Sequence, residues 1–265
     1  MIRLVYPPPE SAPDARTEYP VRLLELALNK AGERFELCPG PNVVQQGAAL
    51  SMMERGESLD IVWSMTSLNR ERRLLPIRIP IYKGLIGWRI AFVSQQRPQL
   101  LARVDSIRRL ARFIACQGHD WPDTALLRAN GLPVCPVDSY DGLFALMHSG
   151  YADYFPRSLA EIWAENAVRA RRDGLVIDDH LALHYPAAFY FFVNRNADLL
   201  AAVIEAGLEC AIADGDFDTL FYDTYGTYIR GAGLRSRRII ELTNPQLPAE
   251  TPLDRQALWF RLTDL

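Results

Sequence analysis

The chain has 265 residues, of which 49% are hydrophobic and 23% are charged, and its formal net charge is -3. That length is enough for one large or two medium domains with substantial cores, and the composition is that of an ordinary soluble globular protein. A slightly acidic chain lacks the concentrated basic face that nucleic-acid binding requires, so we expect no nucleic-acid partner.

The cysteines do not form a metal-binding pattern. Cys38, Cys116, Cys135 and Cys210 have neither Cys-x-x-Cys spacing nor clustered histidines beside them. We therefore expect no metal and no cofactor. Cys116 and Cys135 each end a short apolar run, so they could form a disulfide or remain buried free thiols.

The first part of the chain alternates predicted strands with predicted helices. Short apolar runs predict strands, and longer periodic patterns that end at glycine predict helices. In chain order the elements are a strand at 2–6, a helix at 19–31, a strand at 35–38, a helix at 45–55 and a strand at 59–64. This order is typical of an open parallel sheet that binds its ligand beyond the carboxyl ends of the strands.

The end of the third predicted strand is the part of the sequence that indicates function. The strand leads into a hydroxyl-rich turn at 64–67 and then into an arginine-dense segment at 69–73. Backbone N–H groups, hydroxyls and an arginine at one strand end are suited to holding a carboxylate or another small anion. The sequence places no nucleophile, metal cluster or phosphate loop beside them, so the pattern indicates binding rather than catalysis.

From about Ser94 the alternation begins again. The predicted elements are a helix at 107–113, a strand at 113–116, a helix at 125–129, a strand at 132–137, a helix at 140–149, a strand at 152–155, a helix at 159–171 and a strand at 175–177. Two apolar runs of similar character, 88–93 and 187–193, flank this second unit. Helices predicted at 196–213 and 216–225 would then return to the first.

These elements predict an α/β fold of two lobes joined by two extended hinge crossovers. Lobe 1 would comprise residues 1–93 and 192–265, and lobe 2 would be the inserted segment 94–191. In such a fold the ligand is expected between the lobes, which close on it about the hinge.

A spaced motif follows the third strand of the first lobe. Asp60, Ser64, Ser67 and Arg72 fit the pattern D-hydrophobic-x-x-S-x-x-[ST]-x-x-x-x-R, and a proline-aromatic stretch at 80–82 comes after it.

Two weaker motifs lie in the second lobe. Gln117-Gly118 stands between a strand and a helix, and Gly150-Tyr151-Ala152-Asp153 precedes a further strand end. Together with the order of elements, the motifs of both lobes resemble the type 2 periplasmic solute-binding proteins, in particular the polar-amino-acid-binding branch of bacterial ABC transporters.

The resemblance implies roles for several residues. Arg72 would pair with the α-carboxylate of the ligand, with Arg73 as the alternative if the register differs. The helix after Gly118 would turn its N-terminal amides toward the same carboxylate, although His119 stands where the family has a hydroxyl. The acidic residue that holds the ligand's ammonium in the family falls at Ser158 here, and this departure argues against a standard α-amino acid.

The resemblance, together with residue types at the strand ends, nominates one candidate set for ligand binding: Tyr6, Trp63, Ser64, Thr66, Ser67, Arg72, Gln117, Gly118, His119, Trp121, Arg157 and Ser158. Tyr6 and Trp63, at strand ends, could line a cleft or pack at its rim. Arg157 could be a second anion contact or a solvated arginine before a helix. Asp123 is interpreted as a helix N-cap.

The leading functional hypothesis is a monomeric solute-binding protein for a small, polar, carboxylate-bearing ligand. Its partner would be an ABC-type permease or a membrane sensor, and it would be periplasmic if a signal peptide had been removed. A cyclohexadienyl-type dehydratase on the same fold is the enzymatic alternative, with Asp153, Asp120 or Glu10 as acid–base candidates. A third alternative is a scaffold that binds no ligand.

Overall fold

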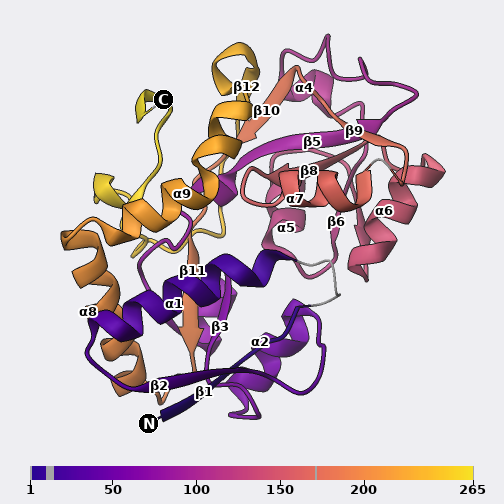
Figure 1. The fold of residues 1–265 in the computed structure, drawn as a ribbon. Coiled ribbons are helices and arrows are strands. Elements are labelled where there is room, and N and C mark those ends of the chain that lie inside the picture. Colours follow the sequence, from indigo (N-terminus) through magenta and orange to yellow (C-terminus); the bar gives the residue numbers. More distant parts are fainter. Residues whose placement is uncertain (1, 10–14, 171, 265) are drawn as a thin grey trace. The chain divides into compact units, whose positions relative to one another are not determined.

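The computed structural model describes residues 2–9, 15–170 and 172–264 of the chain (Figure 1). The chain divides into two compact units, each built from three separate segments. The first unit comprises Met1–Lys83, Ala188–Thr227 and Leu247–Trp259, and the second comprises Gly84–Ala187, Tyr228–Gln246 and Phe260–Leu265.

The first unit contains two small sheets and the longest helices. Its elements are β1 (Ile2–Tyr6), α1 (Glu18–Lys30), β2 (Phe35–Pro39), α2 (Gln46–Glu54), β3 (Val62–Met65), α3 (Leu68–Arg73), β4 (Leu75–Ile77), β11 (Phe189–Val193), α8 (Asp198–Ala213) and α9 (Asp216–Gly231) as far as Thr227. β1 pairs in parallel with β2, while β11 is antiparallel to both β3 and β4.

Asp60 joins the two sheets of this unit. Its carboxylate accepts a hydrogen bond of 2.8 Å from the backbone N–H of Val5, and its own N–H donates to the Val5 carbonyl, also at 2.8 Å. The carboxyl end of β1 is thereby tied to the segment that leads into the amino end of β3. Asp60, the first residue of the spaced motif, therefore has a structural role in the first unit.

Helix α8 packs against α1 on the outside of the first unit (Figure 1). The buried residues of α1 include Leu23, Leu24 and Ala27, and α8 faces them with Ile204 and Gly207. The helices approach so closely at Gly207 that an added Cβ would lie 1.9 Å from the carbonyl oxygen of Ala27. Only glycine fits at this helix crossing.

The second unit is built on a seven-stranded mixed sheet. Its elements are β5 (Trp88–Ser94), α4 (Ile107–Leu110), β6 (Ala115–Gly118), α5 (Pro122–Ala129), β7 (Val134–Val137), α6 (Tyr140–Ser149), β8 (Tyr154–Ser158), α7 (Ile162–Glu165), a π-helical turn (Asn166–Ala170), β9 (Leu175–Ile177), β10 (Leu181–His184) and β12 (Arg238–Glu241). The strand order is β12-β10-β5-β8-β6-β7, with β9 also paired to β5.

In this sheet β6 is parallel to β7 and β8, and β5 is antiparallel to β8. The carboxyl ends of β6, β7 and β8 therefore lie at the same edge of the sheet. In the β5–β8 register Arg89 lies opposite Ser158 and Ile90 lies opposite Arg157. Since successive side chains of a strand point to opposite faces, Arg89 and Ser158 share one face of the sheet and Arg157 lies on the other.

Short 3-10 helices complete the structure, at Ala15–Thr17, Leu85–Gly87, Leu234–Ser236, Gln256–Leu258 and Leu262–Asp264.

The structure departs from the sequence prediction in several elements of the second unit. The helix predicted at 107–113 is confined to Ile107–Leu110, and the strand predicted at 152–155 lies at Tyr154–Ser158. The helix predicted at 159–171 is a single α-turn, α7, followed by the π-helical turn. The strand β12 was not predicted, because its sequence Arg-Ile-Ile-Glu offers only two apolar residues between charges; it becomes a strand by pairing in parallel with β10. The sequence places residues 84–93, 228–246 and 260–265 in lobe 1, whereas the contacts of the chain group them with the second unit. Residues 188–191, placed in lobe 2 by the sequence, group with the first unit.

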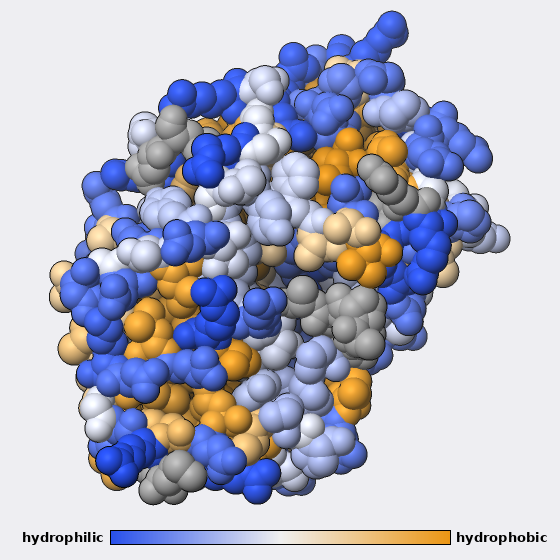
Figure 2. Space-filling view, viewed as in Figure 1, coloured by the Kyte–Doolittle hydropathy of each residue, from blue (hydrophilic) through white to orange (hydrophobic). Residues whose placement is uncertain are grey.

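The four cysteines are free thiols. Cys116 and Cys135 are direct partners in the β6–β7 register, and burial raises the pKa of the Cys116 thiol. In the part of the chain that is described, no helix has the length and apolar character needed to span a membrane. On the face drawn in Figure 2, hydrophilic residues surround small groups of hydrophobic ones.

The contact at Gly207 predicts a strong effect of a single methyl group. We expect Gly207→Ala to lower the free energy of unfolding by about 3 kcal/mol, because the backbone of α1 cannot yield to the added Cβ. Urea unfolding followed by circular dichroism measures this change. Gly231→Ala is the control, since the described residues place no atom within 4 Å of a Cβ there; an equal loss in both variants would contradict the packing argument.

Candidate functional site

Arg70 is the buried guanidinium at the carboxyl end of β3. The side chain is 6% exposed and reaches back from α3 to the strand that precedes it. Its Nη1 donates to the Ser64 hydroxyl and, at 2.9 Å, to the Met65 carbonyl, and its Nη2 donates at 3.0 Å to Oε1 of Gln46. These oxygen atoms are uncharged, and together they fix the plane of the guanidinium.

Arg72, which the spacing motif nominates, lies elsewhere. It is exposed, and its Nε donates to the Leu68 carbonyl at 3.3 Å. The helix begins at Leu68 with Ser67 as its N-cap, so Arg70 in its first turn faces the strand end. Arg72 is two residues further on and about 200° around the helix axis. Arg73, the alternative register, pairs instead with Glu54 at 2.5 Å.

The hydroxyl groups of the turn are all buried and already oriented. The Ser67 hydroxyl accepts a hydrogen bond of 3.3 Å from the backbone N–H of Arg70 and caps α3. The Thr66 hydroxyl donates at 2.6 Å to Glu71, whose other carboxylate oxygen pairs with Arg78 at 2.5 Å. Ser64 is therefore the hydroxyl that accompanies the Arg70 guanidinium, whereas Thr66 is turned toward α3.

Tyr6 and Trp63 form an aromatic pair at the neighbouring strand ends of the same unit. Their ring centroids are 5.8 Å apart, and Trp63 also meets Phe191 edge-on at 6.2 Å. Both residues are half-buried. One part of each ring is thus packed in the unit and another part is accessible.

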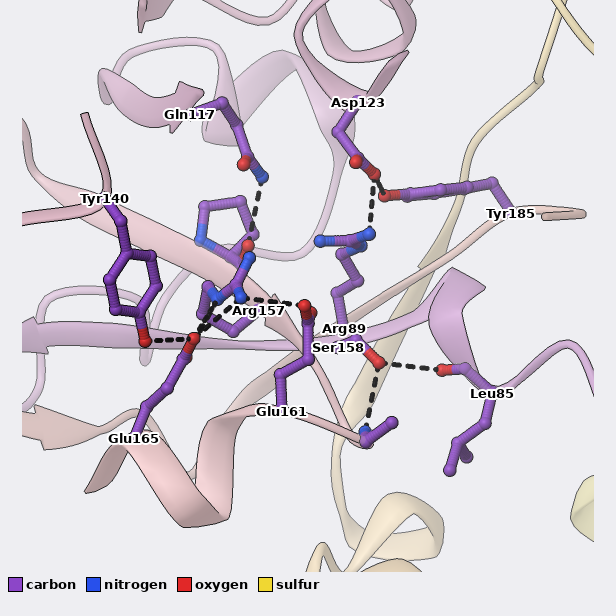
Figure 3. A network of polar contacts seen from close by, with 12 residues as sticks. Leu85, Arg89, Gln117, Asp123, Tyr140, Arg157, Ser158, Glu161, Glu165 and Tyr185 are labelled. Carbon is purple, nitrogen blue, oxygen red and sulfur yellow. Dashed lines mark hydrogen bonds and ion pairs between the residues drawn. The ribbon is translucent and has the colours of Figure 1, made fainter. Parts of the chain in front are cut away.

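In the second unit, Arg157 at the end of β8 lies at the centre of a buried network (Figure 3). Its Nε and Nη2 bind the carboxylate of Glu165 at 2.8 and 2.7 Å, and Nη2 also pairs with Glu161 at 2.9 Å. The Tyr140 hydroxyl donates to Glu165 at 2.8 Å. Burial lowers the pKa of the guanidinium, but the carboxylates of Glu161 and Glu165 outweigh it and hold that pKa well above its ordinary value.

This geometry does not support the predicted role of Arg157 as an anion contact. The side chain is 1% exposed, and two carboxylates already compensate its single charge. An additional anion would meet a cluster whose net charge is negative.

A second buried arginine lies on the opposite face of β8. Arg89 of β5 pairs through Nη2 with Asp123 at 2.7 Å, and the hydroxyl of Tyr185 donates to the same carboxylate oxygen (Figure 3). Burial raises the pKa of the Tyr185 hydroxyl well above its ordinary value. Asp123 is the second residue of α5, whose N-cap is Trp121, so its role is to neutralise Arg89 rather than to cap the helix as predicted.

The other predicted residues of the second unit differ in accessibility. Gln117 is buried and its Nε2 donates to the Pro156 carbonyl at 3.0 Å, and Gly118 is also buried. Ser158 is fully buried, and its hydroxyl accepts a hydrogen bond of 3.0 Å from the N–H of Ala160. His119 is exposed and lies 3.4 Å from Asp138, whereas Trp121 is half-buried.

Solved structures with the same architecture exist, although no protein-family model and no curated protein matches the sequence. An amino acid ABC transporter substrate-binding protein from Streptococcus pneumoniae, bound to L-arginine, has a TM-score of 0.62 and 16% identity, over 86% of this chain and 96% of that chain. A histidine kinase sensor domain similar to periplasmic binding proteins has a TM-score of 0.60 and 16% identity, over 85% and 96%. An ancestral amino acid-binding protein, a precursor of cyclohexadienyl dehydratase, has a TM-score of 0.60 and 13% identity, over 84% and 95%.

The chain has the type II periplasmic binding protein fold. The predicted α/β class is thereby confirmed, and at identities this low the likeness concerns the fold alone. The motifs of a periplasmic binding protein select residues at strand ends in both units of this chain, but they do not identify which side chains are buried there.

Sequence reasoning missed Arg70, Arg89, Glu161 and Glu165. The sequence did contain a signal for two of these residues. Arg157, Glu161 and Glu165 are spaced four residues apart, the interval at which opposite charges pair on a helix. Arg89 is likewise a single charge inside the apolar run 85–94. An arginine in such a run has to be paired when it is buried.

The Arg157 network predicts a large difference between two arginine substitutions. Arg157→Met should lower the free energy of unfolding by about 3–5 kcal/mol, because Glu161 and Glu165 would keep buried charges without their cation. Arg97→Met, which removes a half-exposed pair with Asp153, should cost at most about 1 kcal/mol. Urea unfolding of both variants tests this, and similar losses would contradict the assignment of Arg157 as the buried centre.

Proposed function

We propose that the chain is a solute-binding protein for a small carboxylate-bearing ligand, and that Arg70 holds the carboxylate. The observation that carries the proposal is the placement of Arg70. A buried guanidinium at the carboxyl end of β3 is held in one plane by neutral oxygens of Ser64, Met65 and Gln46. A planar guanidinium that is already oriented binds a carboxylate with little further loss of conformational entropy.

The surroundings of Arg70 favour a small ligand with an apolar portion. The Ser64 hydroxyl lies beside the guanidinium, and the half-buried rings of Tyr6 and Trp63 lie at strand ends of the same unit. Burial strengthens a charge-assisted hydrogen bond relative to water, and aromatic walls add apolar contact area. These features support Tyr6, Trp63, Ser64 and Arg70 as the ligand contacts of the first unit, with Ser67 and Thr66 shaping the turn.

A membrane partner follows from this role. We infer a periplasmic protein that delivers its ligand to an ABC-type permease, and the fold likeness to a transporter substrate-binding protein supports that inference. A signalling partner is the second candidate, since a histidine kinase sensor domain has the same architecture.

Binding without catalysis is the simpler assignment. Of the acid–base candidates, Asp153 accepts a hydrogen bond from the N–H of Ile114 at 2.9 Å and pairs with Arg97. Asp120 is half-buried and is also engaged by a neighbouring group, and Glu10 lies outside the described residues. A carboxylate engaged in this way is poorly placed to move a proton. We therefore do not assign the dehydratase activity to this chain.

A thermal-shift screen tests the proposed function. A ligand that binds only the folded state raises the melting temperature, so some members of a panel of small carboxylates should stabilise the protein in proportion to their concentration. Amines and sugars of similar size serve as controls. The absence of any shift across the carboxylates would contradict the proposal and favour a scaffold without a ligand.

Substitution of two neighbouring arginines tests the assignment of Arg70. We expect Arg70→Ala to weaken binding of a carboxylate found in the screen by about 2–5 kcal/mol, the range for loss of a buried charge partner. Arg72→Ala is the matched control and should leave the affinity unchanged, because Arg72 is exposed and faces away from the strand end. Isothermal titration calorimetry measures both, and the reverse ranking would restore Arg72 as the ligand contact.

A further inference from the structure

A group of exposed arginines lies on the second unit, in the segment that follows β5. Residues 103–112 contain four arginines and one aspartate, whereas the chain as a whole has a formal net charge of -3. The four arginines are exposed: Arg103, Arg108, Arg109 and Arg112. Positive charge is therefore concentrated on one short segment of a slightly acidic protein.

The backbone of this segment is held in place between the arginines. Three apolar side chains anchor it in the core of the unit: Leu101, Val104 and Leu110. The Nη1 of Arg109 donates to the Arg103 carbonyl at 3.0 Å and pairs with Asp105 at 2.7 Å, which fixes the turn before α4. The other arginine side chains therefore project from a fixed backbone.

A fifth arginine joins the group from a distant part of the sequence. Arg238 of β12 is exposed, and its Nη1 donates to the Val104 carbonyl at 3.4 Å, so β12 and α4 lie at the same end of the second unit (Figure 1). Asp179, which precedes the strand beside β12, is already paired with Arg237 at 3.8 Å. The arginine patch is defined by five residues: Arg103, Arg108, Arg109, Arg112 and Arg238. With Asp105 included, its charge is +4.

Three guanidinium groups of the arginine patch are not used within the protein. In the described part of the chain, no hydrogen bond or ion pair engages the side chain of Arg103, Arg108 or Arg112. Arg108 and Arg112 are also four residues apart, a spacing at which like charges on a helical turn repel each other. These arginines therefore contribute little to the stability of the unit, and their N–H groups are open to an external anion.

We propose that the arginine patch docks the protein on the surface of an anionic phospholipid membrane. Guanidinium groups bind phosphate oxygens in a bidentate manner, and basic residues near an anionic lipid surface each add to the binding. The inference concerns a surface that the proposed carboxylate site does not use, so it goes beyond the proposed function and does not depend on it.

Two features favour a lipid surface over other anions. The arginines come from a turn, from the region of α4 and from β12, so they are spread over exposed surface rather than gathered around one buried group. An array of phosphate groups matches such a spread better than one soluble phosphate does. Nucleic acid requires a more extended basic face, and the acidic remainder of the chain would oppose its binding.

Co-sedimentation of the full chain with lipid vesicles tests the proposal. Vesicles of phosphatidylglycerol and phosphatidylcholine in equal parts should retain the protein at low ionic strength, and vesicles of phosphatidylcholine alone should not. Binding should be lost at about 1 M salt, where the Debye length falls to about 3 Å. Equal retention by both vesicles, or retention that resists salt, would overturn the proposal. The absence of retention by either would overturn it in favour of an acidic protein partner.

Substitutions within the arginine patch identify the surface responsible. Arg103→Gln, Arg108→Gln and Arg112→Gln should each weaken vesicle binding about fivefold, the contribution of one basic residue near an anionic surface. The triple variant should bind no more than the phosphatidylcholine background. Circular dichroism confirms that each variant is folded, and a triple variant that binds as the wild type does would overturn the assignment.

A matched control separates the arginine patch from net charge. Arg22, Arg34 and Arg72 are exposed arginines of the first unit, and their combined substitution by glutamine lowers the net charge by the same amount. This control should retain most of the vesicle binding. Equal losses in the two triple variants would show that net charge alone drives the binding, and the assignment to the arginine patch would be wrong.

A soluble headgroup analogue distinguishes a membrane surface from a site for one phosphate. Calorimetry with glycerol 3-phosphate should show no saturable binding that depends on the arginine patch, because a single phosphate can engage only part of the spread guanidinium groups. Saturable binding that the triple variant of the arginine patch abolishes would identify a site for a soluble phosphate compound and would overturn the assignment to a lipid surface.

Discussion

A guanidinium is costly to bury unless acceptors meet its charge, and this requirement governs the strand ends of both units. In the first unit Arg70 is held by a hydroxyl, a carbonyl and an amide oxygen. In the second unit Arg157 and Arg89 are held by carboxylates on opposite faces of β8. The segments that supply these acceptors are the ones that follow the strands, so satisfying each arginine also fixes the adjoining turn and helix.

The two kinds of acceptor have different consequences. The oxygens of Ser64, Met65 and Gln46 are neutral acceptors that orient the guanidinium of Arg70 in one plane. Carboxylates cancel the charge of Arg157 and turn it into a rigid support, on which the indole of Trp121 rests. Arginine is therefore proposed to bind the ligand in the first unit, whereas in the second unit it stabilises the structure, and burial alone does not tell these two roles apart.

The order of elements and the two-lobed α/β class could be predicted from periodicity and glycine stops, because those depend on local sequence. The site residues were harder to predict. Counting from Asp60 selects Arg72, but the side chain that faces the strand is set by where α3 begins, at Leu68, and that depends on Ser67 acting as its cap. Similarly, the partners of Arg157 lie on a segment predicted as a longer helix. Its π-helical turn is a tertiary feature with no sequence signal of its own.

The interleaving of the two units has a consequence for how the chain is made. Each unit needs a segment from beyond Thr227: the sheet of the second unit gains β12, and the first unit gains Leu247–Trp259. Domains tend to fold as units while the ribosome extends the chain. Here neither unit has all of its parts until the residues as far as Trp259 have emerged. An unfinished chain therefore exposes parts of two incomplete cores at once, and its dependence on chaperones during synthesis should exceed that of a protein whose domains follow one another in sequence.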